Sequence, residues 1–151
     1  TRYIGDWSSD VCSSDLLDES LKMMREEGLD NIFFRHNKHK LAISNAVKAL
    51  NLKLFADEKY LSPSITAVKT EEIDAEEFRK TIKNNFDILL AGGQDHLKGK
   101  IFRVGHLGYV NDRDIITVVS AISNTLLALG KITAQQAGEA LGVTYRYLKE
   151  N

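Results

Sequence analysis

LLAGGQDHLKGKIFRVGHLGYV, residues 89–110, contains a glycine-rich loop between two short apolar runs. It holds five of the ten glycines of the 151-residue chain, at positions 92, 93, 99, 105 and 108. Glycine loses more conformational entropy on folding than any other residue, so such clusters mark tight turns or close approach of the backbone to another group. The apolar runs at 87–91 and 101–104 are bounded by these glycines, which predicts two buried strands.

Arg103 lies inside the second apolar run. Alternation along a strand places Phe102 and Val104 on one face and Ile101 with Arg103 on the other. An arginine among apolar residues must find a partner or reach solvent, and its planar fork suits a carboxylate. Gly105 would leave room for a ligand, so Arg103 is the best candidate for an anion-binding residue. The alternative is a non-catalytic α+β binding module in which Arg103 forms a structural ion pair.

Hydrophobic periodicity predicts helices and strands on either side of this segment. The expected order is α-α-β-β-α-β-β-α-α, with the final helix either single or a pair. Two further strands are expected at 52–54 and 65–68. Four short strands interspersed with helices indicate an α+β fold in which helices pack on the sheet.

The strongest helix is expected to open at Asn111 or Asp112 and to end at Gly130. Its apolar positions recur at helical spacing and predict one buried stripe. The stripe consists of Ile115, Val119, Ile122, Leu126 and Leu129.

Other helix starts carry recognisable capping residues. Asp30 can cap the second helix of the chain. Asp74 with Glu77, and Thr133 with Gln136, have the spacing of capping boxes, in which two side chains bond reciprocally to backbone N–H groups.

Residues 1–16, TRYIGDWSSDVCSSDL, show no helical or strand period. They resemble the in-frame translation of a sequencing-adapter oligonucleotide, so we expect a non-native segment outside the fold. Without it the chain loses Trp7 and Cys12, its single tryptophan and single cysteine. The natural protein is then expected to begin upstream, and the domain to occupy residues 17–151.

The overall composition is that of an average globular domain. Hydrophobic residues make up 43% and charged residues 27%, and the formal net charge is -1. A near-neutral chain without a basic tail gives no reason to expect a polyanion as partner. The apolar stretches fall short of the ~20 residues that cross a membrane. We therefore expect a cytoplasmic protein that binds neither nucleic acid nor a membrane.

The segment GGQDHLKGKIFRVGHLGYV resembles the C-terminal signature of class V aminotransferases, in particular the alanine–glyoxylate and serine–glyoxylate group. That signature has a Gly-Gly pair, a short loop, Lys-Gly-Lys, and then Arg-(Ile or Val)-Gly-x-x-Gly. EEGLDNIFFRHNKHKLAISNAVKALNLKLFA (26–56) and ITAVKTEEID (65–74) are also similar to the family. The resemblance covers residues 17–130.

The resemblance implies the small C-terminal domain of a fold-type-I enzyme, a short antiparallel sheet covered by helices. The arginine of the family motif binds the α-carboxylate of the substrate, and it corresponds to Arg103. We expect Gly92, Gly93, Gly105 and His106 to line the same cleft. The parent enzyme is then expected to be a homodimer that uses pyridoxal 5'-phosphate. It would move an amino group between alanine or serine and glyoxylate or pyruvate.

The family's cofactor-binding lysine lies in a large domain that is missing here. Lys98 and Lys100 flank Gly99, and we assign them to a solvated loop, because a Schiff-base lysine needs a buried setting that lowers its pKa. The chain is therefore expected to carry a substrate-binding arginine, no catalytic residue, and no activity by itself.

The sequence contains two further patterns, a histidine pair and a C-terminal tail. His36 and His39 lie three residues apart, as metal ligands can, but no third ligand follows at a suitable spacing, so we expect no metal site. The tail at 132–151 is similar to a DNA-binding helix-turn-helix. Because its second helix is short and the chain is not basic, we expect a helix that packs on its own domain.

Overall fold

The computed structural model describes residues 13–149. The chain divides into two compact units, the first ending at Arg35 and the second beginning at His36. The first unit contains α1 (Ser13–Glu27) and the beginning of α2 (Leu29–Ala49). Gly28, between the two helices, adopts a φ of 83°, which glycine accepts without strain.

The first unit corrects two expectations about helix starts. The first helix begins at Ser13, so the end of the adapter-like segment is helical, while residues 1–12 lie outside the described part. Asp30 does not cap α2, because that helix begins at Leu29 and Asp30 lies in its first turn. An acidic side chain there interacts favourably with the positive end of the helix dipole.

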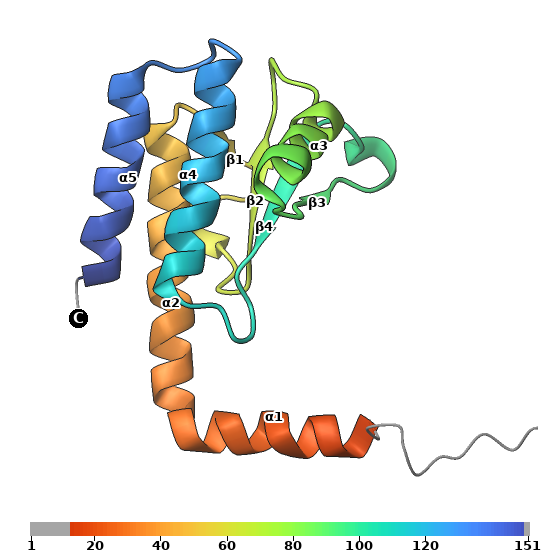
Figure 1. The fold of residues 1–151 in the computed structure, drawn as a ribbon, viewed down its shortest axis with the longest axis vertical. Helices are drawn as coiled ribbons and strands as arrows, with labels where there is room; N and C mark the ends of the chain where they lie inside the picture. Colours follow the sequence, from red (N-terminus) through yellow and green to blue (C-terminus); the bar gives the residue numbers. More distant parts are fainter. Residues whose placement is uncertain (1–12, 150–151) are drawn as a thin grey trace, which may run out of the picture. The chain divides into compact units, whose positions relative to one another are not determined.

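The second unit contains the sheet and most of the helices, and the predicted order of helices and strands is confirmed (Figure 1). The helices α2, α3 (Ala75–Phe86), α4 (Asp112–Ala128) and α5 (Ala134–Lys149) contribute buried residues. The strands are β1 (Lys53–Leu54), β2 (Ile65–Lys69), β3 (Ala91–Gly92) and β4 (Ile101–Gly105). Two short 3-10 helices, Glu58–Tyr60 and Asp95–Leu97, lie in the connecting loops.

The sheet is antiparallel throughout, with strand order β1-β2-β4-β3. One face is buried: Thr66, Val68, Phe102 and Val104 alternate with less buried neighbours along β2 and β4. Phe102 packs on Phe78 of α3, with ring centroids 5.1 Å apart. The predicted α+β fold, a short antiparallel sheet covered by helices, is therefore confirmed.

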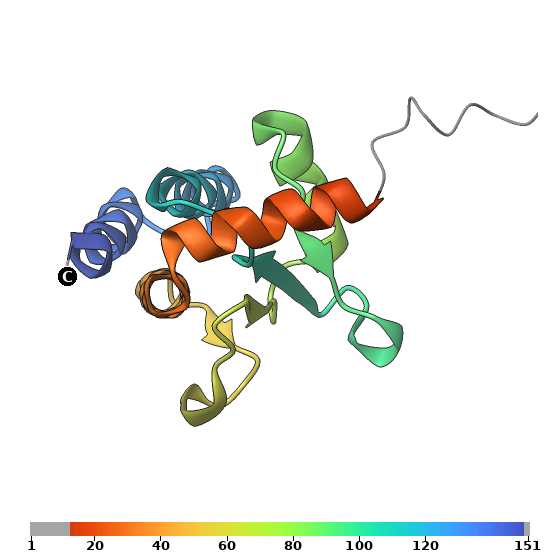
Figure 2. The ribbon, with the colours of Figure 1, turned by 90° about the horizontal axis from the view of Figure 1, so that it is seen from below.

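The helices form the other side of one continuous core. Residues of α2, α3, α4 and α5 join the buried face of the sheet in a single hydrophobic cluster. The α4 helix packs against α3 and α5, and Figure 2 shows α4 and α5 lying side by side. The predicted α4 stripe is buried except for Leu129, which is 49% exposed because the helix ends at Ala128.

The expected bounds of the third strand, 87–91, were wrong, because β3 consists only of Ala91 and Gly92. The α3 helix continues to Phe86, and Asp87 closes it in a left-handed conformation, with its N–H donating to the Lys83 carbonyl. Leu89 is 78% exposed, and only Ala91 and Gly92 pair with β4. The residues of this run form the end of α3 and the loop that leads to β3, rather than one buried strand.

The capping predictions near α3, α4 and α5 hold in their main feature. Asp74 accepts from the backbone N–H groups of Glu76 and Glu77, so it caps α3, but the expected return bond from the Asp74 N–H to the Glu77 side chain is not formed. Thr133 and Gln136 form the expected reciprocal pair, and a single helix follows. Among residues 13–149, no helix is long and apolar enough to cross a membrane.

Candidate functional site

Arg103 lies at the centre of β4, on the less buried face of the sheet. Its direct neighbours across the sheet are Ala67 of β2 and Ala91 of β3, so both flanking positions carry only a methyl group. Gly105 follows two residues later on the same face, and a Cβ added there would meet nothing within 4 Å. We call Arg103, Ala67, Ala91 and Gly105 the Arg103 patch. It is a guanidinium surrounded by small residues.

One nitrogen of Arg103 is already engaged. Its Nε donates to the Gly92 carbonyl at 2.9 Å, which ties the side chain to β3. Within residues 15–149, no acidic side chain forms an ion pair with Arg103. The ion pair of the binding-module alternative is therefore not formed in the described part. Among the described residues, no hydrogen bond or ion pair engages the two terminal nitrogens of the guanidinium, which are both donors.

Gly92 and Gly93 differ from Gly105 because the space beside them is filled. A Cβ on Gly92 would meet the Arg79 side chain at 2.5 Å. A Cβ on Gly93 would lie 2.0 Å from the Leu97 carbonyl oxygen, which belongs to the backbone and cannot rotate away. These two glycines permit close packing around β3, whereas Gly105 leaves open space.

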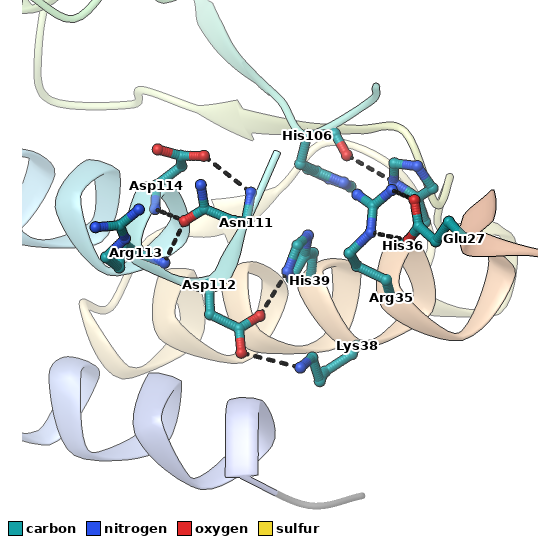
Figure 3. Close-up of polar contacts among 10 residues, drawn as sticks. All are labelled: Glu27, Arg35, His36, Lys38, His39, His106, Asn111, Asp112, Arg113 and Asp114. Carbon is teal, nitrogen blue, oxygen red and sulfur yellow. Dashed lines mark hydrogen bonds and ion pairs between the residues drawn. The ribbon is translucent and has the colours of Figure 1, made fainter. Parts of the chain in front are cut away.

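His106 is fully buried and points to the core side. Its Nε2 lies 3.0 Å from the Thr66 hydroxyl. Its backbone carbonyl accepts a hydrogen bond from His36 Nδ1 at 2.9 Å, which Figure 3 shows. Burial lowers the pKa of His106 to about 4, and the neighbouring His39 and His36 act in the same direction. An odd number of positions separates His106 from Arg103, so their side chains lie on opposite faces.

His36 and His39 belong to polar contacts rather than to a metal cluster. His39 Nε2 lies 2.8 Å from one oxygen of Asp112, and Lys38 Nζ lies 3.0 Å from the other (Figure 3). Burial raises the pKa of Asp112, but the bonds from His39 and Lys38 outweigh it and hold that pKa below its usual value. In residues 15–149, no three His, Cys, Asp or Glu side chains gather as metal ligands do; Cys12 lies outside the described residues.

These contacts were not found from the sequence. The spacing of His36 and His39 indicated a shared helix face, which is correct, but their partners lie about 70 positions further along the chain. One available signal was the strand period, which places His106 on the face of Phe102 and Val104. Lys98 and Lys100 are exposed, as expected for a solvated loop.

No family model matches the chain. Among individual proteins, it is 54% identical over 114 residues to the "Soluble hydrogenase 42 kDa subunit" of Anabaena cylindrica, covering 76% of this chain and 30% of the relative. It is 33% identical over 127 residues to the (S)-ureidoglycine–glyoxylate transaminase of Bacillus subtilis, covering 83% and 30%. It is 31% identical over 138 residues to the serine–glyoxylate aminotransferase of Methylorubrum extorquens, covering 89% and 34%.

Comparison with solved structures also finds an aminotransferase. The crystal structure of ureidoglycine–glyoxylate aminotransferase from Bacillus subtilis matches with a TM-score of 0.79 at 32% identity, covering 86% of this chain and 34% of that one. The chain thus spans about 30% of the length of the curated relatives it matches.

Proposed function

The chain belongs to the class V aminotransferases, and from this we propose that it is the substrate-carboxylate-binding part of a transaminase. The full-length enzyme moves an amino group between a small amino acid, alanine or serine, and a 2-oxo acid, glyoxylate or pyruvate. The names of the transaminase relatives support glyoxylate as the acceptor. We also propose that this enzyme is a homodimer.

The observation that carries the proposal is the Arg103 patch. A guanidinium with small residues on both sides has room for a planar carboxylate. Because Nε is held by the Gly92 carbonyl, the two terminal nitrogens are left to donate to the two carboxylate oxygens. Amino acids and 2-oxo acids share this carboxylate, so one arginine serves both substrates of a transamination.

Pyridoxal phosphate is the cofactor that the family implies, and it supplies the electron sink of transamination when bound. The lysines of residues 15–149 do not fit its binding, since each is exposed or only partly buried. A Schiff-base lysine needs a buried setting. The part of the reaction that these residues perform is therefore to bind and orient the substrate carboxylate.

Substitution of Arg103 in the full-length enzyme tests this function. Arg103→Ala should raise KM for the amino acid and for the 2-oxo acid by about 10- to 100-fold, as expected for loss of a charged hydrogen-bonding partner. Arg103→Lys should give KM values between those of the unchanged enzyme and Arg103→Ala, because lysine keeps the positive charge but lacks the planar, two-pronged guanidinium.

Lys98→Ala is the matched control, since it removes an exposed cation from the loop before β4. It should leave both KM values within about twofold. Unchanged KM values for Arg103→Ala would refute the proposed role.

A further inference from the structure

We propose that His106 is a positioning residue that holds the C-terminal end of β4, and with it the Arg103 patch, at a fixed place on the sheet. This inference rests on the proposed function of Arg103. It assigns His106 no contact with substrate, because its ring is buried on the opposite face.

His106 forms two hydrogen bonds to the beginning of β2, one to the residue before the strand and one to Thr66 inside it. Its backbone N–H donates to the Ser64 carbonyl at 2.9 Å, one step beyond the last strand pair, Ile65 with Gly105. Its ring then bonds to the Thr66 hydroxyl at 3.0 Å. The backbone and side chain of one residue therefore fix the same strand end to its neighbour.

A second tie runs to a helix. A carbonyl can only accept, so His36 Nδ1 carries the proton in the 2.9 Å bond to the His106 carbonyl. His36 precedes the buried residues Ala42, Ile43 and Val47 of α2, which anchor that helix in the core. His106 is thereby held between β2 and α2.

The chain around His106 has few other means of staying in place. His106 is the only buried residue between Val104 and Ile115. Leu107 and Tyr109, which follow it, are 68% and 81% exposed. Without the ties to β2 and α2, the backbone at Gly105 would gain freedom, and the open side of the patch would lose its shape.

Thr66 allows a test that leaves the ring and Arg103 in place. In the full-length enzyme, Thr66→Val should raise KM for both carboxylate substrates about five- to tenfold, the effect of one lost hydrogen bond, with kcat changed less than about twofold. Thr66→Ser keeps the hydroxyl and should restore most of the affinity.

Thr125→Val is the matched control. Thr125 is equally buried, and its hydroxyl donates to the Ala121 carbonyl inside α4 at 2.8 Å. Thr125→Val removes a buried hydroxyl, as Thr66→Val does, but at a position outside β2 and β4. It should leave both KM values unaltered. His36→Asn and His36→Leu form a second pair, since asparagine can still donate to the His106 carbonyl and leucine cannot.

The outcomes separate this inference from the proposed function. If Arg103→Lys raises KM while Thr66→Val behaves like Thr125→Val, the positioning role is refuted and the carboxylate site stands. If Arg103→Lys leaves KM unchanged, the proposed function itself fails. Should Thr66→Val not fold, equal KM values for His36→Asn and His36→Leu would overturn the inference.

Discussion

Gly105 and Gly93 lie on either side of Arg103 in the sequence and have opposite surroundings. Beside Gly105 there is open space within 4 Å, while a side chain on Gly93 would collide with the Leu97 carbonyl. Gly105→Ala should therefore fold with nearly unchanged stability but raise KM for carboxylate substrates, because its methyl group enters the patch. Urea denaturation and steady-state kinetics of the full-length enzyme measure the two effects.

Gly93→Ala should show the reverse pattern. Its Cβ requires the backbone around Leu97 to move, and overpacking of this kind destabilises by about 1–3 kcal/mol. A Gly105→Ala variant as unstable as Gly93→Ala would contradict the open space assigned to the patch.

His106 should make stability depend on pH. Its folded-state pKa of about 4 lies below its ordinary value of 6.5, so between these values the unfolded chain binds more protons than the folded one. The free energy of unfolding is therefore highest above pH 6.5, as far as His106 is concerned. It falls by up to roughly 3 kcal/mol as pH is lowered towards 4. The facing groups His36 and His39 add repulsion when they are protonated.

Urea denaturation of the chain at pH values between 7 and 4.5 measures this loss. His106→Gln removes the titrating ring and should flatten the curve in that range. A variant curve as steep as that of the unchanged chain would assign the pH dependence to other residues.

At the level of single residues, the sequence predicted which face of the sheet a side chain lies on better than it predicted which residues that side chain contacts. Arg103 was placed on the correct face by strand alternation, and its face neighbours are small because Ala67 and Ala91 pair with it. Those pairings, and the bond from Thr66 to His106, depend on strand register. Register is set by the whole sheet and cannot be read from a local pattern.

At the scale of the helix, α4 begins with a complete capping box. Asn111 accepts from the N–H groups of Arg113 and Asp114, and Asp114 accepts from the Asn111 N–H in return. Asn111→Ala should cost about 1 kcal/mol of unfolding free energy, measured by urea denaturation. The exposed neighbour Arg113 serves as the control, since Arg113→Ala should stay within about 0.5 kcal/mol. Equal losses in both variants would argue against the cap.

The helices and strands were predicted well where caps and periodicity agreed, and poorly where an apolar run was the only signal. The starts of α3, α4 and α5 follow from side chains that bond within three residues. The apolar letters at 87–91 looked like a strand, but Asp87 takes a left-handed conformation with φ 54° and ends α3 there. A short apolar run fits more than one structure, and tertiary context decides among them.

For the whole molecule, the core lies in one unit. Every residue of the buried cluster, from Ala42 to Leu148, belongs to the unit that begins at His36. Deletion of the adapter-like residues 1–16 should therefore leave the urea midpoint of the chain unchanged, because every residue of this cluster remains. A lower midpoint would show that this segment contributes to the stability of the fold.

The α+β class, the order of elements and Arg103 as an anion-binding candidate follow from the residue pattern, whereas the antiparallel sheet and the α-carboxylate as the anion were expected from the family resemblance. Periodicity cannot give a strand order such as β1-β2-β4-β3, because each pairing joins residues distant in the sequence. Two relatives at 54% identity are named as hydrogenase subunits and others as transaminases, so the names alone do not decide the activity. Activity has to be argued from the site.

A crystal structure of the full-length enzyme with its cofactor and a bound carboxylate substrate tests the central claim most directly. We expect both oxygens of the carboxylate to lie about 2.7–2.9 Å from the two terminal nitrogens of Arg103, with Nε still held by the Gly92 carbonyl. A carboxylate bound to other residues, with the Arg103 patch empty, would contradict it.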